Sequence, residues 1–397
     1  MKKSNIKIIT NGNFPYGSAS ANYLKYFAFA LSDNFHVEVI LPSGNCYGLL
    51  NKVATFRKGN LRNIYYRHLG FVIHPKNYVG KVLDNILAIL LPFFYLIKEK
   101  FKKRCDYLII YNITFIDLLG VIFFKCITNT RLIFILPEFY EKPSKCISLL
   151  KWYNFYWGLK FLSKYANAHI VLSSYLKNYL KNTLKINKPI LILPNIIDPE
   201  FFSVIKNKKL NYTIGYVGSP TRKDGVDDLI KSFALFNQKY PHTSLLIIGD
   251  TINTVLPNLK IMTEKFGIKD KVKFTGLVPY NKVPPLLMSC QMLVLTRPKG
   301  VFAEAGFPTK LGEYFACKKP VVVTKVGDIP FYFEDEKHVI LVEPENIESI
   351  SHGFERILLN SDLSKNMVEN AYDWMNKNLN YRNVSNSLNE FIQIICI

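Results

Sequence analysis

The feature that most constrains the fold is an alternation between apolar runs and segments of helical pattern, sustained along the whole 397-residue chain. The runs are apolar almost throughout, which is typical of strands that are covered on both faces of a sheet. Such strands, when separated by helices, build parallel sheets. The apolar runs are IKIIT, VEVILP, YLIIYN, RLIFIL, AHIVLS and PILILPN, followed by YTIGYVG, SLLIIG, KVKFTG, MLVLT, PVVVT and VILVEP.

Pro, Asn and Lys residues interrupt this alternation at residues 194–211, PNIIDPEFFSVIKNKKLN. The chain is also longer than one hydrophobic core usually fills. We therefore predict an α/β protein of two doubly wound, Rossmann-like domains that face each other across a cleft, residues 1–205 and 206–379, with a hinge near 200–210. The last stretch, 380–397, has a helical pattern and is expected to pack back on the first domain.

Composition limits the compartment and the chemistry. Apolar residues make up 49% and charged residues 20%, the mix of a folded protein. The seven Cys form no C-x-x-C pair, which favours a reducing, cytoplasmic location, and the seven His show no metal-ligand spacing. The start MKKSNIKIIT reads as a strand rather than a signal sequence. The longest apolar run, residues 86–97, is too short to cross a bilayer, so no transmembrane helix is expected.

The positive charge of the chain is unevenly distributed. Residues 1–200 carry 27 Lys and Arg against 10 Asp and Glu, a net charge of +17, whereas residues 201–397 carry 24 against 20, a net charge of +4. A basic surface binds nucleic acid, anionic lipid or phosphorylated substrates. Nucleic acid is disfavoured, because the sequence has no basic stripe interleaved with aromatic residues and no known binding module.

Residues 82–104, VLDNILAILLPFFYLIKEKFKKR, join an apolar aromatic stretch to a mainly basic run. Apolar and basic residues in succession favour attachment to an anionic membrane surface. The alternative is a buried helix followed by a solvated charge run. Both interpretations remain open at this point.

A small-residue turn precedes a short helical pattern in GFPTKLGEYFACKKPVVV, residues 306–323. Gly306, Phe307, Pro308 and Thr309 form the turn, and the helix is expected to begin at or near Pro308. The first turn of a helix presents unpaired N–H groups and a partial positive charge, which attract an anion. That charge is about half a unit against about two negative charges on a nucleotide-sugar diphosphate, so side-chain cations or a metal must supply the rest. The sequence therefore predicts a diphosphate site that includes other positive groups.

Cations are present near this turn. Lys310 lies in the first helical turn and Arg297 follows the strand MLVLT, while Arg222 and Lys223 occupy a second strand-to-helix turn, GYVGSPTRKDGVDDLIKSFALF. No Asp-x-Asp pair that could hold Mg²⁺ on a diphosphate is present, so side-chain cations are preferred to a metal. The alternative for Arg222 and Lys223 is an ordinary exposed basic loop.

Glu313 is the acidic candidate of this helix. If Thr309 is the N-cap, the acidic residue of a capping box would stand at position 312, so Glu313 is not placed for capping. It lies on the same helical face as Lys310, where a carboxylate could accept hydrogen bonds from ribose hydroxyls. A solvated ion pair between Lys310 and Glu313 is the alternative.

A further small-residue loop follows the first predicted strand. Tyr16, Gly17 and Ser18 stand between IKIIT and an apolar helical segment, where the backbone could approach a ligand closely. A plain connection is the alternative. The loop lacks G-x-G-x-x-G, so a nicotinamide or flavin dinucleotide has little support.

Together these segments resemble the family-4 glycosyltransferases with the GT-B fold, over nearly the whole chain. GFPTKLGEYFACKKPVVVT is similar to the family signature GxPxKLxEYxAxGKPVV, and VGSPTRKDGVDDLIKSFALF is similar to VGxxxxKxGVDxLIxAF. FPYGSASANYLKYFAFAL resembles the opening loop of the family, and ILPNIIDPEFF resembles the segment that closes its first domain.

The resemblance implies a nucleotide-sugar donor, usually UDP-linked, in the second domain, and transfer with retention of configuration, without a metal or other cofactor. It implies that Glu313 holds the ribose, that Lys223 and Arg222 bind the diphosphate and that the backbone of residues 306–310 meets the donor. Gly17 would face the phosphate from the first domain. Val278 and Pro279, in GLVPYNKVP, would lie near the base.

Three positions depart from the family pattern. A Glu that often stands eight residues before the helix Glu is Ala305 here, with Glu304 displaced by one. A frequent Gly-Arg pair reads Gly218-Ser219, which leaves the phosphate to Arg222 and Lys223. Where many relatives carry a His in the first domain, LPEFYEK offers Glu138, which either contacts a ligand or caps a helix.

We therefore expect a cytoplasmic enzyme, free or peripheral on the inner face of the membrane. It would transfer a sugar to a hydroxyl of a lipid-linked or saccharide acceptor in the synthesis of capsule, lipopolysaccharide or exopolysaccharide. Another GT-B enzyme, such as a nucleotide-sugar epimerase or a phosphorylase, is an alternative. A basic nucleic-acid-binding protein is a second one.

Overall fold

The chain divides into two compact units in a computed structural model that describes residues 3–15, 17, 19–44, 56–111, 115–143, 146–203, 210–250 and 255–395. Unit 1 comprises Met1–Ile196 and Tyr381–Ile397, and unit 2 comprises Ile197–Asn380. The predicted boundary at residue 205 lies later than this division. The reason is that Ile197 already pairs with unit 2, where its N–H donates to the Leu379 carbonyl at 2.9 Å. Residues 204–209 of the predicted hinge lie outside the described residues.

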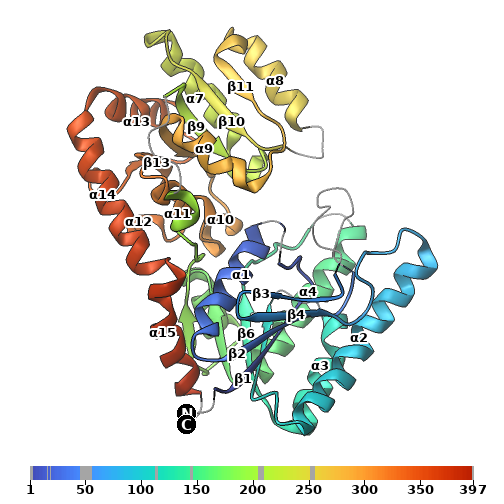
Figure 1. Ribbon diagram of the computed structural model, residues 1–397. Helices are drawn as coiled ribbons and strands as arrows, with labels where there is room; N and C mark the ends of the chain where they lie inside the picture. Colours follow the sequence, from blue (N-terminus) through green and yellow to red (C-terminus); the bar gives the residue numbers. More distant parts are fainter. Residues whose placement is uncertain are drawn as a thin grey trace. The chain divides into compact units, whose positions relative to one another are not determined.

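Unit 1 is built on an eight-stranded sheet in the order β3-β4-β2-β1-β5-β6-β7-β8, in which only the β3–β4 pair is antiparallel (Figure 1). Its strands are β1 (Asn5–Thr10), β2 (His36–Leu41), β3 (Lys58–Leu61), β4 (Ile64–His68), β5 (Tyr107–Tyr111), β6 (Arg131–Leu136), β7 (Ala168–Val171) and β8 (Ile190–Ile192). Its helices are α1 (Ala19–Ser32), α2 (Tyr78–Phe101), α3 (Phe115–Thr128), α4 (Cys146–Tyr165), α5 (Ser174–Asn178) with a π-helical turn at Tyr179–Thr183, and α15 (Tyr381–Ile394).

The helices of unit 1 form two layers. The connections β4-α2-β5, β5-α3-β6 and β6-α4-β7 all step along the sheet in one direction, and such crossovers are almost always right-handed, so these helices share one face of the sheet. The connection β1-α1-β2 steps the other way and places α1 on the opposite face. There α15 packs against α1, with the Ser385 hydroxyl donating to the Ala30 carbonyl at 2.6 Å.

Unit 2 is built on a six-stranded, wholly parallel sheet in the order β11-β10-β9-β12-β13-β14. Its strands are β9 (Tyr212–Val217), β10 (Leu245–Ile248), β11 (Val272–Phe274), β12 (Cys290–Leu295), β13 (Val321–Thr324) and β14 (Ile340–Val342). Its helices are α6 (Glu200–Ser203), α7 (Val226–Lys239), α8 (Val255–Lys265), α9 (Val283–Met288), α10 (Val301–Ala305), α11 (Thr309–Ala316), α12 (Ile329–Tyr332), α13 (Ile347–Leu359) and α14 (Ser361–Asn378), with 3₁₀ turns at Arg222–Asp224, Lys269–Lys271 and Tyr280–Lys282.

The predicted doubly wound α/β architecture is confirmed, and each of the twelve apolar runs contains a strand. The hairpin of β3 and β4 was not predicted. Its sequence, KGNLRNIYYRH, is short and largely polar, and its turn places Arg62 at a φ of 52°, a conformation that sequence patterns associate with Gly or Asn.

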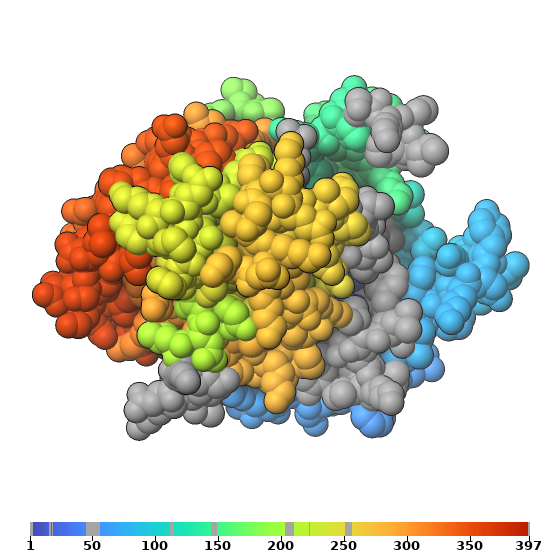
Figure 2. Space-filling model, turned by 90° about the horizontal axis from the view of Figure 1, so that it is seen from above, coloured from blue at the N-terminus to red at the C-terminus, as the bar shows by residue number. Residues whose placement is uncertain are grey.

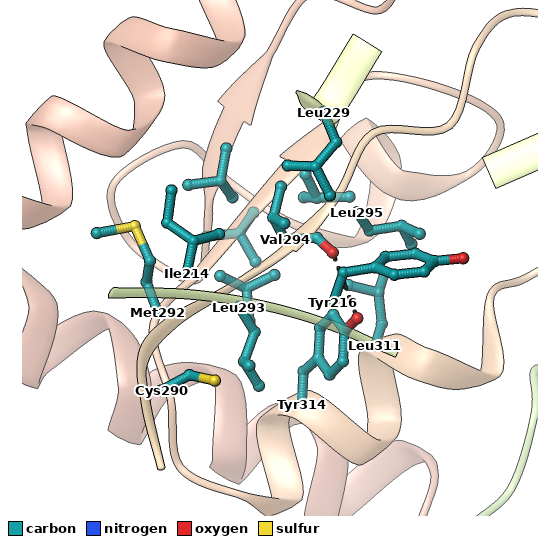
Figure 3. Packing of buried hydrophobic residues seen from close by; sticks show 14 of the residues in the cluster. Ile214, Tyr216, Leu229, Cys290, Met292, Leu293, Val294, Leu295, Leu311 and Tyr314 are labelled. Carbon is teal, nitrogen blue, oxygen red and sulfur yellow. Dashed lines mark hydrogen bonds between the residues drawn. The ribbon is translucent and has the colours of Figure 1, made fainter. Parts of the chain in front are cut away.

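The core of unit 2 brings strand and helix residues together beneath the strand ends (Figure 3). Leu293 and Leu295 of β12 and Leu311 and Tyr314 of α11 are fully buried there. The Tyr314 hydroxyl donates to the Val294 carbonyl at 3.3 Å and accepts the Val217 N–H at 3.1 Å, so it joins α11 to two neighbouring strands. This packing holds α11 against β9 and β12.

Helix α2 differs from the expectation for its segment. The predicted apolar run is broken by Pro92, but the helix continues through Pro92 to a length of 24 residues. Among the described residues, α2 is one helix whose length and apolar composition would allow it to span a membrane. A core helix of a soluble protein can meet the same two criteria.

Candidate functional site

The candidate site lies at the carboxyl edge of the unit 2 sheet. The strand order reverses between β9 and β12, and ligands of open α/β sheets bind at such a switch point. The loops that leave β9 and β12 contain Gly218 and Arg297, and the loop that follows β11 contains Val278 and Pro279. The topology thus gathers the predicted donor segments at one edge.

A hydrogen-bonded network joins the β9 loop to α11. The Lys310 ammonium donates to Asp224 Oδ2 at 2.6 Å, and the Tyr216 hydroxyl donates to the same oxygen at 2.7 Å. Burial alone would raise the pKa of Asp224, but Lys310, Tyr216 and Arg297 outweigh burial and hold this pKa below its usual value. Lys310 is therefore held in place by a buried carboxylate. In Figure 3 the Tyr216 hydroxyl points away from the labelled leucines of the core cluster.

Two glycines allow the β9 loop to approach its neighbours. A Cβ on Gly218, whose φ is 143°, would lie 2.3 Å from Lys310 Cε. A Cβ on Gly225, whose φ is 66°, would lie 1.9 Å from the Thr296 carbonyl oxygen. Side chains at these positions would displace Lys310 or separate the β9 and β12 loops, so both close approaches require glycine.

Arg297 is only 5% exposed and holds the loop before α11. Its guanidinium donates to the carbonyls of Gly306 and Phe302, each at 3.3 Å. It also lies 5.6 Å from the centroid of the Phe302 ring, and Lys223 Nζ lies 5.9 Å from the same centroid. The structure thus brings Arg297, Gly306 and Lys223 around Phe302.

Helix α11 begins at Thr309 with Pro308 as its N-cap. The Leu311 N–H bonds to the Pro308 carbonyl at 3.1 Å, while Thr309 and Lys310 occupy the first helical positions, whose N–H groups have no partner inside a helix. Phe307 is buried and packs against Tyr332 and Trp374. The predicted start of the helix is confirmed, with Thr309 inside the helix rather than at its cap.

Glu313 lies in a buried position, 8% exposed, on the inner side of α11. It accepts a hydrogen bond from the Tyr280 hydroxyl at 3.1 Å. Burial raises the pKa of Glu313 to about 7, although the Tyr280 hydrogen bond and Lys310 act in the opposite direction. The alternative of a solvated Lys310–Glu313 ion pair is wrong, because Lys310 pairs with Asp224 and Glu313 is desolvated.

The β11 loop approaches α11 through Tyr280. Pro279 is exposed and caps the 3₁₀ turn that Tyr280 begins, and Val278 is half-buried against the core. The Tyr280 ring stacks on Phe201 at 4.8 Å between centroids, with 10° between the planes. Val278 and Pro279 therefore flank the residue that contacts Glu313.

The positions that depart from the family pattern have definite environments. Glu304 is exposed and accepts the Gly327 N–H at 3.3 Å, whereas Ala305 is buried. In unit 1, Glu138 follows β6, is exposed and accepts a hydrogen bond from the Tyr140 hydroxyl at 2.6 Å.

The remaining unit 1 candidate, Gly17, follows β1. A Cβ there would lie 2.7 Å from Asn13 Cβ, so the loop is too tight for a side chain. Ser18 and the side chain of Arg222 lie outside the described residues. No group of three or more His, Cys, Asp and Glu suited to a metal ion occurs among the described residues.

Sequence reasoning missed Asp224, Tyr216, Tyr280 and Phe302. Asp224 stands beside Lys223 and Tyr280 beside Pro279, so their neighbours in sequence were a usable signal. Tyr216 and Phe302 gave none, because an aromatic residue in a strand or short helix is usually a core residue.

Residues 198–374 match the family model for the glycosyl transferases group 1. An uncharacterized glycosyltransferase of Methanocaldococcus jannaschii is 25% identical over 231 residues, 55% of this chain and 58% of that protein. The chain thus spans little more than half the length of the curated relatives that it matches first.

Solved structures extend the likeness to the whole fold. The Anabaena protein HepE in complex with UDP has a TM-score of 0.72 and 14% identity, over 98% of this chain and 100% of that one. WaaG, a glycosyltransferase involved in lipopolysaccharide biosynthesis, has a TM-score of 0.66 and 16% identity, over 97% and 99%. The predicted GT-B fold class is confirmed.

Proposed function

We propose that the chain transfers a sugar from a nucleotide-sugar donor, a UDP-sugar, to a hydroxyl of a lipid-linked or saccharide acceptor. The transfer retains the anomeric configuration and needs no metal ion. The product belongs to a capsule, lipopolysaccharide or exopolysaccharide, and the enzyme acts at the inner face of the cytoplasmic membrane. UDP is favoured because HepE, a protein of similar fold, has been solved with UDP and with UDP-glucose.

One observation carries the proposal: the candidate cations and the candidate ribose-binding carboxylate meet at one strand edge. Lys310 is fixed by Asp224, Arg297 fixes the loop before α11, and Glu313 is buried beside Tyr280. An anion at this edge meets the N-terminus of α11 together with Lys310 and Lys223. A structural ion-pair network on a surface would not bury a carboxylate such as Glu313, whose hydrogen-bond partner is the Tyr280 hydroxyl.

The proposed chemistry gives each residue one task. Glu313 accepts hydrogen bonds from the ribose hydroxyls, and Val278 and Pro279 flank the base. Lys310 and Lys223 offset the charge that grows on the departing diphosphate. The bond between the anomeric carbon and the diphosphate oxygen breaks, the acceptor oxygen bonds to that carbon on the same face, and the acceptor proton passes to the diphosphate.

The donor site is tested by calorimetric titration of the full chain with UDP. Lys223→Ala should weaken UDP binding about 10-fold or more, since a charge-assisted contact contributes about 1.5–3 kcal/mol. Lys265→Ala, an exposed lysine at the end of α8, is the matched control and should bind as the wild type does. Equal affinity in the two variants would remove Lys223 from the site.

The reaction class is tested by offering UDP-sugars with and without membrane lipid extract and following nucleotide release. Release that depends on an acceptor is expected for a transferase. Conversion of the donor without an acceptor would instead indicate an epimerase or a hydrolytic activity.

A further inference from the structure

The outward side of α2 reverses the usual distribution of a surface helix. Its buried side contains two carboxylates, Asp84 and Glu99, with Ala88, Pro92 and Leu96. Its solvent side contains large apolar residues that are 41–62% exposed: Val82, Leu83, Ile86, Leu90 and Phe94. A surface helix of a soluble protein normally buries the apolar side and exposes the charges. Figure 2 shows the light-blue beginning of α2 open to solvent in that view.

Helix α3 continues this apolar surface. Ile116, Leu119, Phe123 and Ile127 recur at helical spacing and are 44–58% exposed. The two helices lie side by side in Figure 1 and approach so closely that a Cβ on Gly120 would lie 2.1 Å from the Ile89 carbonyl oxygen. The outward stripes of α2 and α3 therefore form one surface rather than two separate patches.

Helix α4 adds amphipathic aromatic residues to the same layer. Tyr153 and Trp157 are 41% and 43% exposed, and the Lys160 ammonium lies 5.2 Å from the Trp157 ring centroid. The helix contacts α3 through the Phe115 and Phe161 rings, 5.1 Å apart. Trp, Tyr and Lys together are typical of the boundary between lipid and water. We call the exposed apolar and aromatic residues of α2, α3 and α4 the apolar face.

The charges beside the apolar face are mainly positive. Lys98, Lys102, Lys103 and Arg104 are exposed at the end of α2 and just after it. The two acidic residues of α2 are buried, the sequence of α4 contains no acidic residue, and that of α3 contains one, Asp117. An anionic surface therefore complements this side of unit 1, whereas a second copy of the same basic surface would repel it.

Helix α2 is fastened to the sheet, which favours docking over insertion. Asp84 accepts the Gly44 N–H at 3.0 Å, and Glu99 accepts the Lys7 ammonium at 3.2 Å. The Tyr95 hydroxyl donates to Glu38 at 2.8 Å. Spanning a bilayer would break these bonds and place two carboxylates in hydrocarbon, which is strongly unfavourable.

We propose that the apolar face docks on an anionic lipid bilayer. The apolar and aromatic residues enter the boundary between headgroups and acyl chains, and the basic residues bind anionic headgroups. This inference rests on unit 1 alone, so it stands or falls separately from the donor site. If both hold, the bilayer supplies the acceptor as a lipid-linked hydroxyl compound.

The experiment is flotation of the full chain with phosphatidylcholine vesicles and with vesicles that also contain phosphatidylglycerol. Binding is expected only to the anionic vesicles and should fall as salt is raised. Phe94→Gln should lower the bound fraction several-fold. Ile261→Gln, equally exposed at 62% but on α8 of unit 2, is the matched control and should not change it. Calorimetry with UDP on both variants checks the donor site independently.

Three outcomes would overturn the proposal. Absence of vesicle binding, or equal binding to both vesicle types, removes the anionic bilayer as the partner. Protein that stays in the vesicles through alkaline carbonate extraction assigns α2 to a membrane-spanning helix. A wild-type dimer that Phe94→Gln converts to a monomer, with flotation unchanged, assigns the apolar face to a second copy of the chain.

Discussion

The two units share a doubly wound sheet but bury their charges in different places. In unit 2, Asp224, Arg297 and Glu313 are buried at the carboxyl edge of the strands. In unit 1, Lys7, Glu38 and Glu99 are buried between the sheet and α2. The buried charges of unit 2 lie where ligands of open α/β sheets usually bind, whereas those of unit 1 join α2 to the sheet. This difference in location is why we propose a binding role for the first group and a structural role for the second.

The largest effect is expected from breaking the buried ion-pair network of Lys7, Glu38 and Glu99 in unit 1. Lys7→Met removes the cation that Glu38 and Glu99 share, and Glu38 keeps only its pair with Arg67, so the free energy of unfolding of unit 1 should fall by about 3–5 kcal/mol. Chemical denaturation of the full chain measures it. Adding Glu38→Gln and Glu99→Gln should recover much of the loss, and a triple variant no more stable than Lys7→Met would contradict this account.

The second effect separates stability from binding in unit 2. Because burial raises the pKa of Glu313 to about 7 from 4.5, the folded state holds more protons than the unfolded state between these values. The stability that the folded state gains from holding this proton on Glu313 is therefore fully present below pH 4.5. It is lost as the pH rises through 7. Glu313→Gln should raise the free energy of unfolding at pH 8 by up to about 3 kcal/mol.

The same variant should bind UDP about 10-fold or more weakly, because a neutral amide replaces the acceptor of the ribose hydroxyls. Denaturation at several pH values tests the predicted gain in stability, and calorimetry with UDP tests the predicted loss of affinity. A variant that is more stable and binds UDP normally would make Glu313 a core residue only.

The third effect concerns the partner of Glu313. Tyr280→Phe keeps the ring on Phe201 but removes the hydroxyl, so we expect a loss of about 1 kcal/mol in UDP binding at pH 8. The pKa of Glu313 should rise further, because this hydrogen bond lowers it. Titration of UDP affinity against pH measures both changes, and an unshifted profile would count against the contact.

The smallest effect is a surface pair. Lys325→Ala removes an ion pair with Glu343 whose two side chains are 41% and 54% exposed, so the free energy of unfolding should change by less than about 0.5 kcal/mol. Denaturation under the conditions used for Lys7→Met measures it. A loss comparable to that of Lys7→Met would mean that burial does not separate the two kinds of pair.

Sequence patterns predicted the strand alternation, the two-unit organisation and the turn before α11, because each depends on neighbouring residues. They could not place Asp224 on Lys310 or Tyr280 on Glu313, since these contacts join α11 to residues that are 86 and 33 positions earlier in the chain. The inverted distribution on α2 was also hidden. Its sequence shows which residues are apolar, but only the sheet beneath determines which side is covered.

The return of α15 to α1 affects the order in which the protein can be completed during synthesis. Unit 2 is one continuous stretch of chain, so all of it can emerge from the ribosome before Tyr381 does. Unit 1 begins first but lacks the helix that covers α1 until unit 2 has been translated. A nascent chain therefore presents an uncovered α1 throughout that interval, and a chaperone would find its binding surface there.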